Sequence, residues 1–167
     1  MKSTNIRIII LFIVLVCLSA CYSFKGGSVP PHLKTIAIPT FNDQSGFGEP
    51  NLREIFTNKV KELFIKDNSL ELSNELTSDC LLECTILNIT NEPSVIAPGE
   101  TVEKWKITMN VNVVFQDLKL KKKIFEKRLS NWTEYDASSG IEARQNAITS
   151  TIDKLSEDIL LEVVAKW

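Results

Sequence analysis

The stretch TVEKWKITMNVNVVFQDL, from Thr101 to Leu118, has the clearest alternation of apolar and polar residues in the chain. One alternate set is apolar and comprises Trp105, Ile107, Met109, Val111, Val113 and Phe115. The other set is polar and includes Lys106, Thr108, Asn110 and Asn112. Because successive side chains of a strand point to opposite faces, this pattern predicts a long strand with one buried face and one face in water. A sheet of this kind needs a second layer over its apolar face.

Other strand-like segments flank this stretch. They are Lys34 to Phe41, Asp79 to about Asn91, and about Lys123 to Tyr135, with a short β-like stretch at Leu70 to Leu72. Pro39 restricts the first of them to a sheet edge or to the strand's end, because proline cannot donate to a β-ladder. The segment from Asn91 to Gly99 contains two prolines, which bracket Val95 and Ile96, and it is therefore predicted to be a loop.

Two segments have apolar residues at helical spacing. The first begins at Asn51, and its apolar positions are Leu52, Ile55, Phe56, Val60, Leu63 and Phe64. The second opens with a predicted capping box of Ser139 and Glu142, runs to the last residue, Trp167, and has the stripe Ile148, Ile152, Leu155, Ile159 and Val163. Two such helices can cover one sheet face. The sequence therefore predicts an α/β (α+β) fold, a two-layer sandwich with both helices on one face of a mixed four-stranded sheet.

The N-terminus has the features of an export signal. Lys2 and Arg7 precede an apolar run from Ile8 to Leu18, which is too short to span a bilayer. The next residues complete the sequence Leu18-Ser19-Ala20-Cys21, which resembles the bacterial lipobox. We therefore expect a signal peptide at residues 1–20, acylation of Cys21, a lipidated tether at 21–33 rich in Gly, Ser and Pro, and a single domain at 34–167.

The residue after the acylated cysteine indicates in which membrane the protein is anchored. Inner-membrane retention in many Gram-negative bacteria requires Asp at this position, whereas this chain has Tyr22. We therefore expect a lipid anchor in the outer membrane, on its periplasmic side. The alternative for Cys21 is a buried or disulfide-bonded cysteine that happens to follow small residues.

The net charge and the cysteines argue against nucleic-acid binding, a disulfide and a metal site. Removing residues 1–20 takes away two of the 19 basic residues and none of the 21 acidic ones, so the remaining chain has a net charge of −4. This charge disfavours nucleic-acid binding. Cys80 and Cys84, four positions apart on a predicted strand, would be about 13 Å apart, which is too far for a disulfide. We predict two buried free thiols and no metal site.

The motifs of common enzymes are absent from the sequence. The only histidine, His32, falls in the predicted tether, where it is expected to be an exposed linker residue, and no G-x-S-x-G occurs. The chain also lacks a phosphate-binding Walker loop, a dinucleotide fingerprint and an H-E-x-x-H motif. The sequence predicts a protein that is not an enzyme and that needs no cofactor.

A family resemblance extends over most of the mature chain. The runs CYSF (Cys21 to Phe24) and SVPPHLKTIAIPTF (Ser28 to Phe41) resemble the mature N-terminus of the LptE family, the lipopolysaccharide-assembly lipoproteins of the outer membrane. The likeness continues through NLR, where the first helix begins, and in element order to Trp167. One departure is Tyr22, where the family often has glycine. The resemblance implies a lipoprotein that partners and plugs the LptD outer-membrane β-barrel and helps deliver lipopolysaccharide to the outer leaflet.

Two alternative functions remain open. The run IAIPTFND, from Ile36 to Asp43, also resembles the first strand and turn of curli-secretion lipoproteins and of lipoprotein activators of peptidoglycan synthases. Such activators usually need a long linker through the peptidoglycan, whereas about twelve residues separate Cys21 from the first strand here. We therefore favour the LptE function. A purely structural lipoprotein is the third hypothesis.

Two groups of residues are candidates for binding. Basic residues concentrate around the predicted hairpin between the last two strands, at Lys119, Lys121, Lys122, Lys123, Lys127 and Arg128. We hypothesise that Lys121, Lys122 and Lys123, with Lys104 and Lys106, bind the phosphates of lipid A, the alternative being a solvated turn whose lysines guard a sheet edge. Val95, Ile96 and an exposed Phe47 are candidates for docking on the partner barrel. The alternative for Val95 and Ile96 is that they fold back onto the core.

Overall fold

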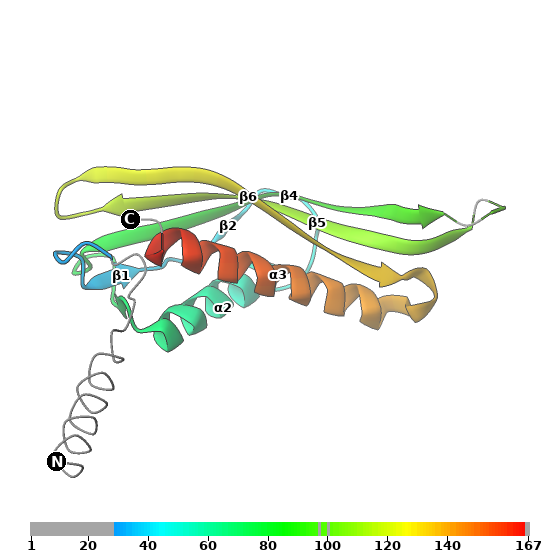
Figure 1. The fold of residues 1–167 in the computed structure, drawn as a ribbon, viewed down its shortest axis with the longest axis horizontal. Helices are drawn as coiled ribbons and strands as arrows, with labels where there is room; N and C mark the ends of the chain where they lie inside the picture. Colours follow the sequence, from blue (N-terminus) through cyan, green and yellow to red (C-terminus); the bar gives the residue numbers. More distant parts are fainter. Residues whose placement is uncertain (1–28, 97, 100, 166–167) are drawn as a thin grey trace, which may run out of the picture.

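The computed structural model describes residues 29–96, 98–99 and 101–165 of the chain. The predicted signal peptide, the predicted acylation site Cys21, residues 22–28 of the predicted tether and Trp167 lie outside these residues. The described residues form two layers, with a sheet as one layer and two helices as the other (Figure 1).

The sheet is mixed and has six strands. Its long strands are consecutive and antiparallel: β4 (Cys80–Ile96), β5 (Val102–Asp117) and β6 (Lys122–Asp136). Three short strands run parallel to their neighbours: β1 (Thr35–Ala37), β2 (Asn42–Asp43) and β3 (Glu71–Leu72). The order is β3-β1-β4-β5-β6, with β2 also paired to β4, so β6 is an edge strand.

The predicted α+β class and layer arrangement are confirmed. The sheet has six strands rather than four for two local reasons. The predicted first strand is divided into β1 and β2, with Pro39 between them, and the stretch near Leu72 pairs with β1 as β3. The helices α2 (Leu52–Asp67) and α3 (Gly140–Val164) contact each other and lie on the same side of the sheet (Figure 1).

The core lies between the two layers. The predicted inward positions of β5 from Ile107 to Phe115 are completely buried. In α2 the buried apolar residues are Leu52, Phe56, Val60 and Phe64. Their spacing of four makes a narrow stripe, so Ile55 lies on the helix flank and is exposed, contrary to the prediction. The predicted stripe of α3 is buried from Ile148 to Val163.

Both ends of α3 differ from the prediction. A short 3₁₀ turn, η1 (Ala137–Ser139), precedes the helix and holds Ser139 at φ −87° and ψ 0°. A capping serine normally has an extended backbone, and the Ser139 side chain makes no capping hydrogen bond. The predicted capping box is therefore wrong. The helix ends at Val164, before the predicted end at Trp167.

The segment predicted as a loop from Asn91 to Gly99 is largely strand. β4 continues to Ile96 and pairs with β5 from Cys80 opposite Asp117 to Ile96 opposite Val102. Pro93 is tolerated because the pairing of β2 with β4 extends only to Ile86, so β4 is an edge strand beyond that point. The β4–β5 hairpin therefore projects beyond the helix layer (Figure 1).

Candidate functional site

The projecting end of the β4–β5 hairpin carries exposed apolar side chains. Val95 is 38% exposed and Ile96 is 62% exposed, and neither belongs to the hydrophobic core. The pairing with β5 shifts register on both sides of Val95, which marks an irregular, bulged end. We call Val95, Ile96 and the opposing residues Val102 and Lys104 the hairpin tip. In the isolated domain, the alternative that Val95 and Ile96 fold back onto the core is wrong.

Two of the predicted lysines lie at or near the hairpin tip. Lys104 is in register with Val95 on one side and with Asp136 on the other. Lys106 lies between Glu92 and Glu134 in the neighbouring strands. Opposite charges on adjacent strands attract each other, so the positive potential of this pair is partly offset.

An exposed tryptophan that the sequence reasoning did not single out lies beside Lys106. Trp132 on the edge strand β6 is 51% exposed, and its ring centroid is 5.9 Å from the Lys106 ammonium and 5.7 Å from that of Lys154 on α3. The Lys154 ammonium also donates a hydrogen bond to the Trp132 carbonyl oxygen at 2.8 Å. Two cations thus fix the indole at the sheet edge. The sequence signal was the alternation of β6, which puts Trp132 on the water face.

The other predicted lysines lie at the opposite end of β5. Lys123 is in register with Gln116, ten residues from Lys106, which corresponds to about 34 Å along a strand. Lys123 pairs with Glu126 at 2.6 Å. The five predicted lysines therefore do not form one site. Because β6 is an edge strand, the position of the hairpin lysines also agrees with the alternative that they guard the edge.

Phe47 is not an exposed docking residue. Its ring is half-buried and packs against the hydrophobic core. The Arg144 guanidinium of α3 lies 5.0 Å from the ring centroid and also pairs with Glu49 at 3.0 Å. This contact explains the error, because the covering residue is 97 positions away in the sequence. Phe47 helps to fix the loop before α2 on the domain.

His32 lies in a cluster of charged groups that joins the N-terminal segment to the sheet. Its Nε2 is 2.6 Å from Oδ2 of Asp117 at the end of β5. The Lys119 ammonium donates to the His32 carbonyl oxygen at 2.7 Å and pairs with Asp79 at 2.8 Å. His32 is exposed, as predicted, but it is bonded to Asp117 of the sheet instead of standing free in a linker. Leu33 next to it is buried in the core.

The carboxylates of this cluster are held in their charged form. The Lys119 hydrogen bond, with the backbone N–H groups of Lys34 and Thr35, lowers the pKa of Asp79. Burial acts to raise the pKa of Asp117, but the hydrogen bonds from His32 and from the Leu120 N–H together outweigh it, so this pKa is also lowered. Both carboxylates therefore stabilise the folded state at neutral pH.

We expect Asp79→Asn to lower the free energy of unfolding at pH 7 by about 1 to 2 kcal/mol, because it removes a charge-assisted hydrogen bond. The folded-state pKa of Asp79 is depressed, so its contribution is present above the unfolded-state pKa and is lost as pH falls through the folded-state pKa. Urea unfolding at pH 7 and below pH 4 measures this difference. Glu54→Gln, on the exposed face of α2, is the control and should have no comparable effect. An equal loss at both pH values would contradict the role of the charge.

Cys80 and Cys84 are unreactive at neutral pH. Cys80 and Cys84 are free and buried on the inner face of β4, as predicted. Burial raises the pKa of each thiol to about 12, so neither forms the reactive thiolate at neutral pH. Among the described residues, no cluster of three His, Cys, Asp or Glu side chains could hold a metal ion.

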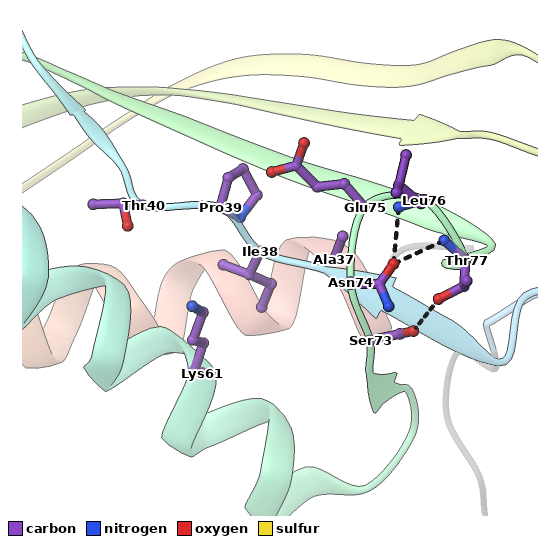
Figure 2. A pocket seen from close by; sticks show the side chains of 10 residues that line it. All are labelled: Ala37, Ile38, Pro39, Thr40, Lys61, Ser73, Asn74, Glu75, Leu76 and Thr77. Atoms are coloured by element: carbon purple, nitrogen blue, oxygen red, sulfur yellow. Dashed lines mark hydrogen bonds between the residues drawn. The ribbon is translucent and has the colours of Figure 1, made fainter.

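A surface hollow of about 580 Å³ lies where the chain leaves β1 (Figure 2). It is lined by residues 37–40, by Lys61 of α2 and by the loop of residues 73–77. The loop bonds to itself, because Oδ1 of Asn74 accepts hydrogen bonds from the N–H groups of Leu76 and Thr77 at 3.0 and 3.1 Å. The charged groups left for a ligand are Lys61 and Glu75, whose opposite signs give no preference for either ligand charge.

Within the described part of the chain, no helix has the length and hydrophobicity that crossing a bilayer requires. The candidate binding features of the described residues are surfaces. They are the projecting hairpin tip, the uncovered polar sheet face and the charged cluster at His32. The class defined by this fold is a small α+β domain with two helices on one face of a mixed sheet.

Comparison with known proteins identifies the family. The family model LptE, described as lipopolysaccharide-assembly, matches residues 33–163, which is most of the chain. The chain therefore belongs to the LptE family. This membership confirms the resemblance seen in the sequence and assigns the chain to the envelope lipoproteins of lipopolysaccharide assembly. No curated protein matches the chain.

Solved structures share the fold at low sequence identity. A hypothetical protein of Chlamydia trachomatis is 12% identical, with a TM-score of 0.59 and coverage of 78% of this chain and 95% of its own. The rare lipoprotein B of Shewanella oneidensis is 10% identical, with a TM-score of 0.54 and coverage of 77% and 92%. At these identities the likeness supports the fold alone.

Proposed function

We propose that this chain is an outer-membrane lipoprotein that assembles with an LptD-like β-barrel, plugs its lumen and helps to deliver lipopolysaccharide to the outer leaflet. Acylated Cys21 would anchor it on the periplasmic side. The observation that carries the proposal is the LptE family match over residues 33–163. The same match favours this function over curli secretion, activation of a peptidoglycan synthase or a purely structural role.

The shape of the domain suits a plug. The sheet face away from the helices carries side chains such as Thr108, Asn110 and Asn112, which are only partly buried. The interior of an outer-membrane barrel is polar, so this face can meet a barrel wall without leaving apolar surface in water. The 16 residues of β5 extend over about 54 Å, which is long enough to reach deep into a lumen.

The hairpin tip is the proposed docking point for the barrel. Val95 and Ile96 lie on a paired strand that is already ordered, so docking them costs little conformational entropy. Lys104 and Lys106 on the neighbouring strand are the proposed contacts for lipid A phosphates at this end. Trp132, which lies against Lys106, would add an aromatic surface.

The combined substitution Val95→Asp with Ile96→Asp tests this docking role. We expect it to reduce recovery of the barrel partner strongly in a pull-down through a C-terminal tag, from outer membranes solubilised in mild detergent. The melting temperature of the isolated domain should move by no more than about one or two degrees, because both residues lie outside the core.

Ile65→Asp is a suitable control, because Ile65 is an exposed apolar residue on α2, away from the tip. This variant should recover the barrel like the unchanged chain. Full recovery of the barrel by the tip variant would contradict the docking role. A steep fall in its melting temperature would show that the tip supports the fold instead.

A further inference from the structure

We propose that the end of the domain nearest Cys21 is a contact surface for a bilayer containing anionic phospholipids. We call this surface the anchor end and define it by Lys34, Leu76 and the β5–β6 turn from Leu118 to Lys122. The inference rests on the proposed acyl anchor at Cys21. It adds a second contact, between protein side chains and the phosphates of the membrane that holds the anchor.

The structure brings the N-terminal segment and the β5–β6 turn together. The Lys119 ammonium is bonded to the His32 carbonyl oxygen, and His32 is bonded to Asp117 just before the turn. β1 and the β5–β6 turn lie at one end of the molecule, and the tip of the β4–β5 hairpin lies at the other (Figure 1). A tether from Cys21 therefore reaches the domain beside this turn.

The anchor end carries lysines that are not used in ion pairs. Asp79 and Asp117 are bonded to Lys119 and His32, and two exposed carboxylates, Glu71 and Glu75, lie beside Lys34 and Leu76. In contrast, Lys34, Lys121 and Lys122 make no ion pair with any acidic side chain among the described residues. Lys121 has a left-handed backbone, φ +52°, in the tight turn. These ammonium groups are available to lipid phosphates.

Two leucines at the same end of the domain are exposed. Leu120 is 65% exposed in the turn, between Lys119 and Lys121. Leu76 is 98% exposed, in the loop that leads to β4, and the Asn74 side chain fixes this loop (Figure 2). Exposed apolar side chains next to lysines are the combination that binds the headgroup region of a bilayer. Exposing these two leucines to water does not stabilise the domain.

The length of the tether keeps this end close to the membrane. Eight Cα–Cα steps separate Cys21 from Val29, the first described residue, and they span at most about 28 Å. The hairpin tip lies farther from Cys21 than the anchor end does, by most of the length of β5. Since the anchor supplies a high local concentration of bilayer, even weak contacts at the anchor end would be occupied.

The test uses the chain from Tyr22 to Trp167 without its acyl group, which retains every residue that the structure describes and the whole core. Its co-sedimentation is measured with phosphatidylcholine vesicles that contain phosphatidylglycerol, with pure phosphatidylcholine vesicles, and with lipopolysaccharide. Lys121→Ser with Lys122→Ser should weaken binding to the anionic vesicles at low salt by roughly fivefold for each lysine. The matched control, Arg53→Ser with Lys59→Ser, removes two charges from α2 and should bind like the unchanged chain.

Several outcomes would overturn the inference. Unchanged binding of the Lys121 and Lys122 variant to anionic vesicles is one, and an equal loss in the α2 control is another, because it would show a general charge effect. A loss confined to lipopolysaccharide would assign these lysines to that ligand instead. No outcome depends on the barrel, so failure here is distinct from failure of the proposed function. Mass spectrometry of the membrane-extracted protein separately tests whether Cys21 is acylated.

Discussion

Replacing Phe56 with alanine is expected to lower the free energy of unfolding by about 3 to 5 kcal/mol. Phe56 is completely buried in the second turn of α2. Its ring lies edge-to-face with that of Phe41, with centroids 5.1 Å apart. Phe41 in turn precedes β2, and its backbone N–H donates to the buried hydroxyl of Thr57 at 2.9 Å. A cavity at Phe56 would therefore remove contacts between the helix layer and the segment that links β1 to β2.

Urea unfolding followed by circular dichroism measures this loss. Ile65→Ala is the control on the same helix, because Ile65 is 64% exposed, and its effect should stay within about 0.5 kcal/mol. Similar losses in the two variants would contradict the assignment of Phe56 to the core. A change in the slope of the transition would indicate that the denatured state has changed instead.

The long strands were predictable because their pattern is local. A strand that buries one face must alternate, so Ile107 to Phe115 could be assigned to the inner face from the sequence alone. The stripe of α3 was equally clear, because apolar residues recur at helical spacing from Ile148 to Val163. Because the apolar face of a sheet must be covered by a second layer, these two patterns led to the prediction of an α+β sandwich.

The length of β4 was not predictable from local patterns. Proline usually ends a strand, and Pro93 led to a predicted loop. Its effect depends on whether a second strand needs the missing N–H, and that depends on where β2 stops pairing, at Ile86. Edge status is a property of the assembled sheet. The position of Val95 and Ile96 therefore required the structure.

The contacts of the candidate surfaces are also non-local. His32 and Asp117 are 85 residues apart, and Arg144 is 97 residues from its partner Phe47. No spacing rule joins such residues, so neither partner was predicted, and Phe47 was predicted to be exposed. Likewise, the five candidate lysines looked like one group in sequence composition, but β5 separates them to its two ends.

Cys21→Ala is expected to abolish acylation and permanent membrane anchoring of the chain. Without the Cys21 thiol there is nothing to acylate, so the protein should either keep its signal peptide or become soluble. A single myristoyl chain binds a bilayer only marginally, at about 0.8 kcal/mol for each buried methylene, whereas the three chains expected on Cys21 make release negligible. Labelling with a palmitate analogue, followed by membrane fractionation, measures both effects.

The other cysteines make this experiment specific. Cys80 and Cys84 are buried, and their pKa values of about 12 keep the thiols protonated, so they should not take up the label. Cys17→Ala is the matched control, because Cys17 lies inside the predicted signal peptide and its loss should leave labelling of the mature chain unchanged. Labelling of the Cys21→Ala variant at the level of the unchanged chain would mean that the chain is not anchored through Cys21. The proposed route from the acyl group through the tether to the anchor end would then be wrong.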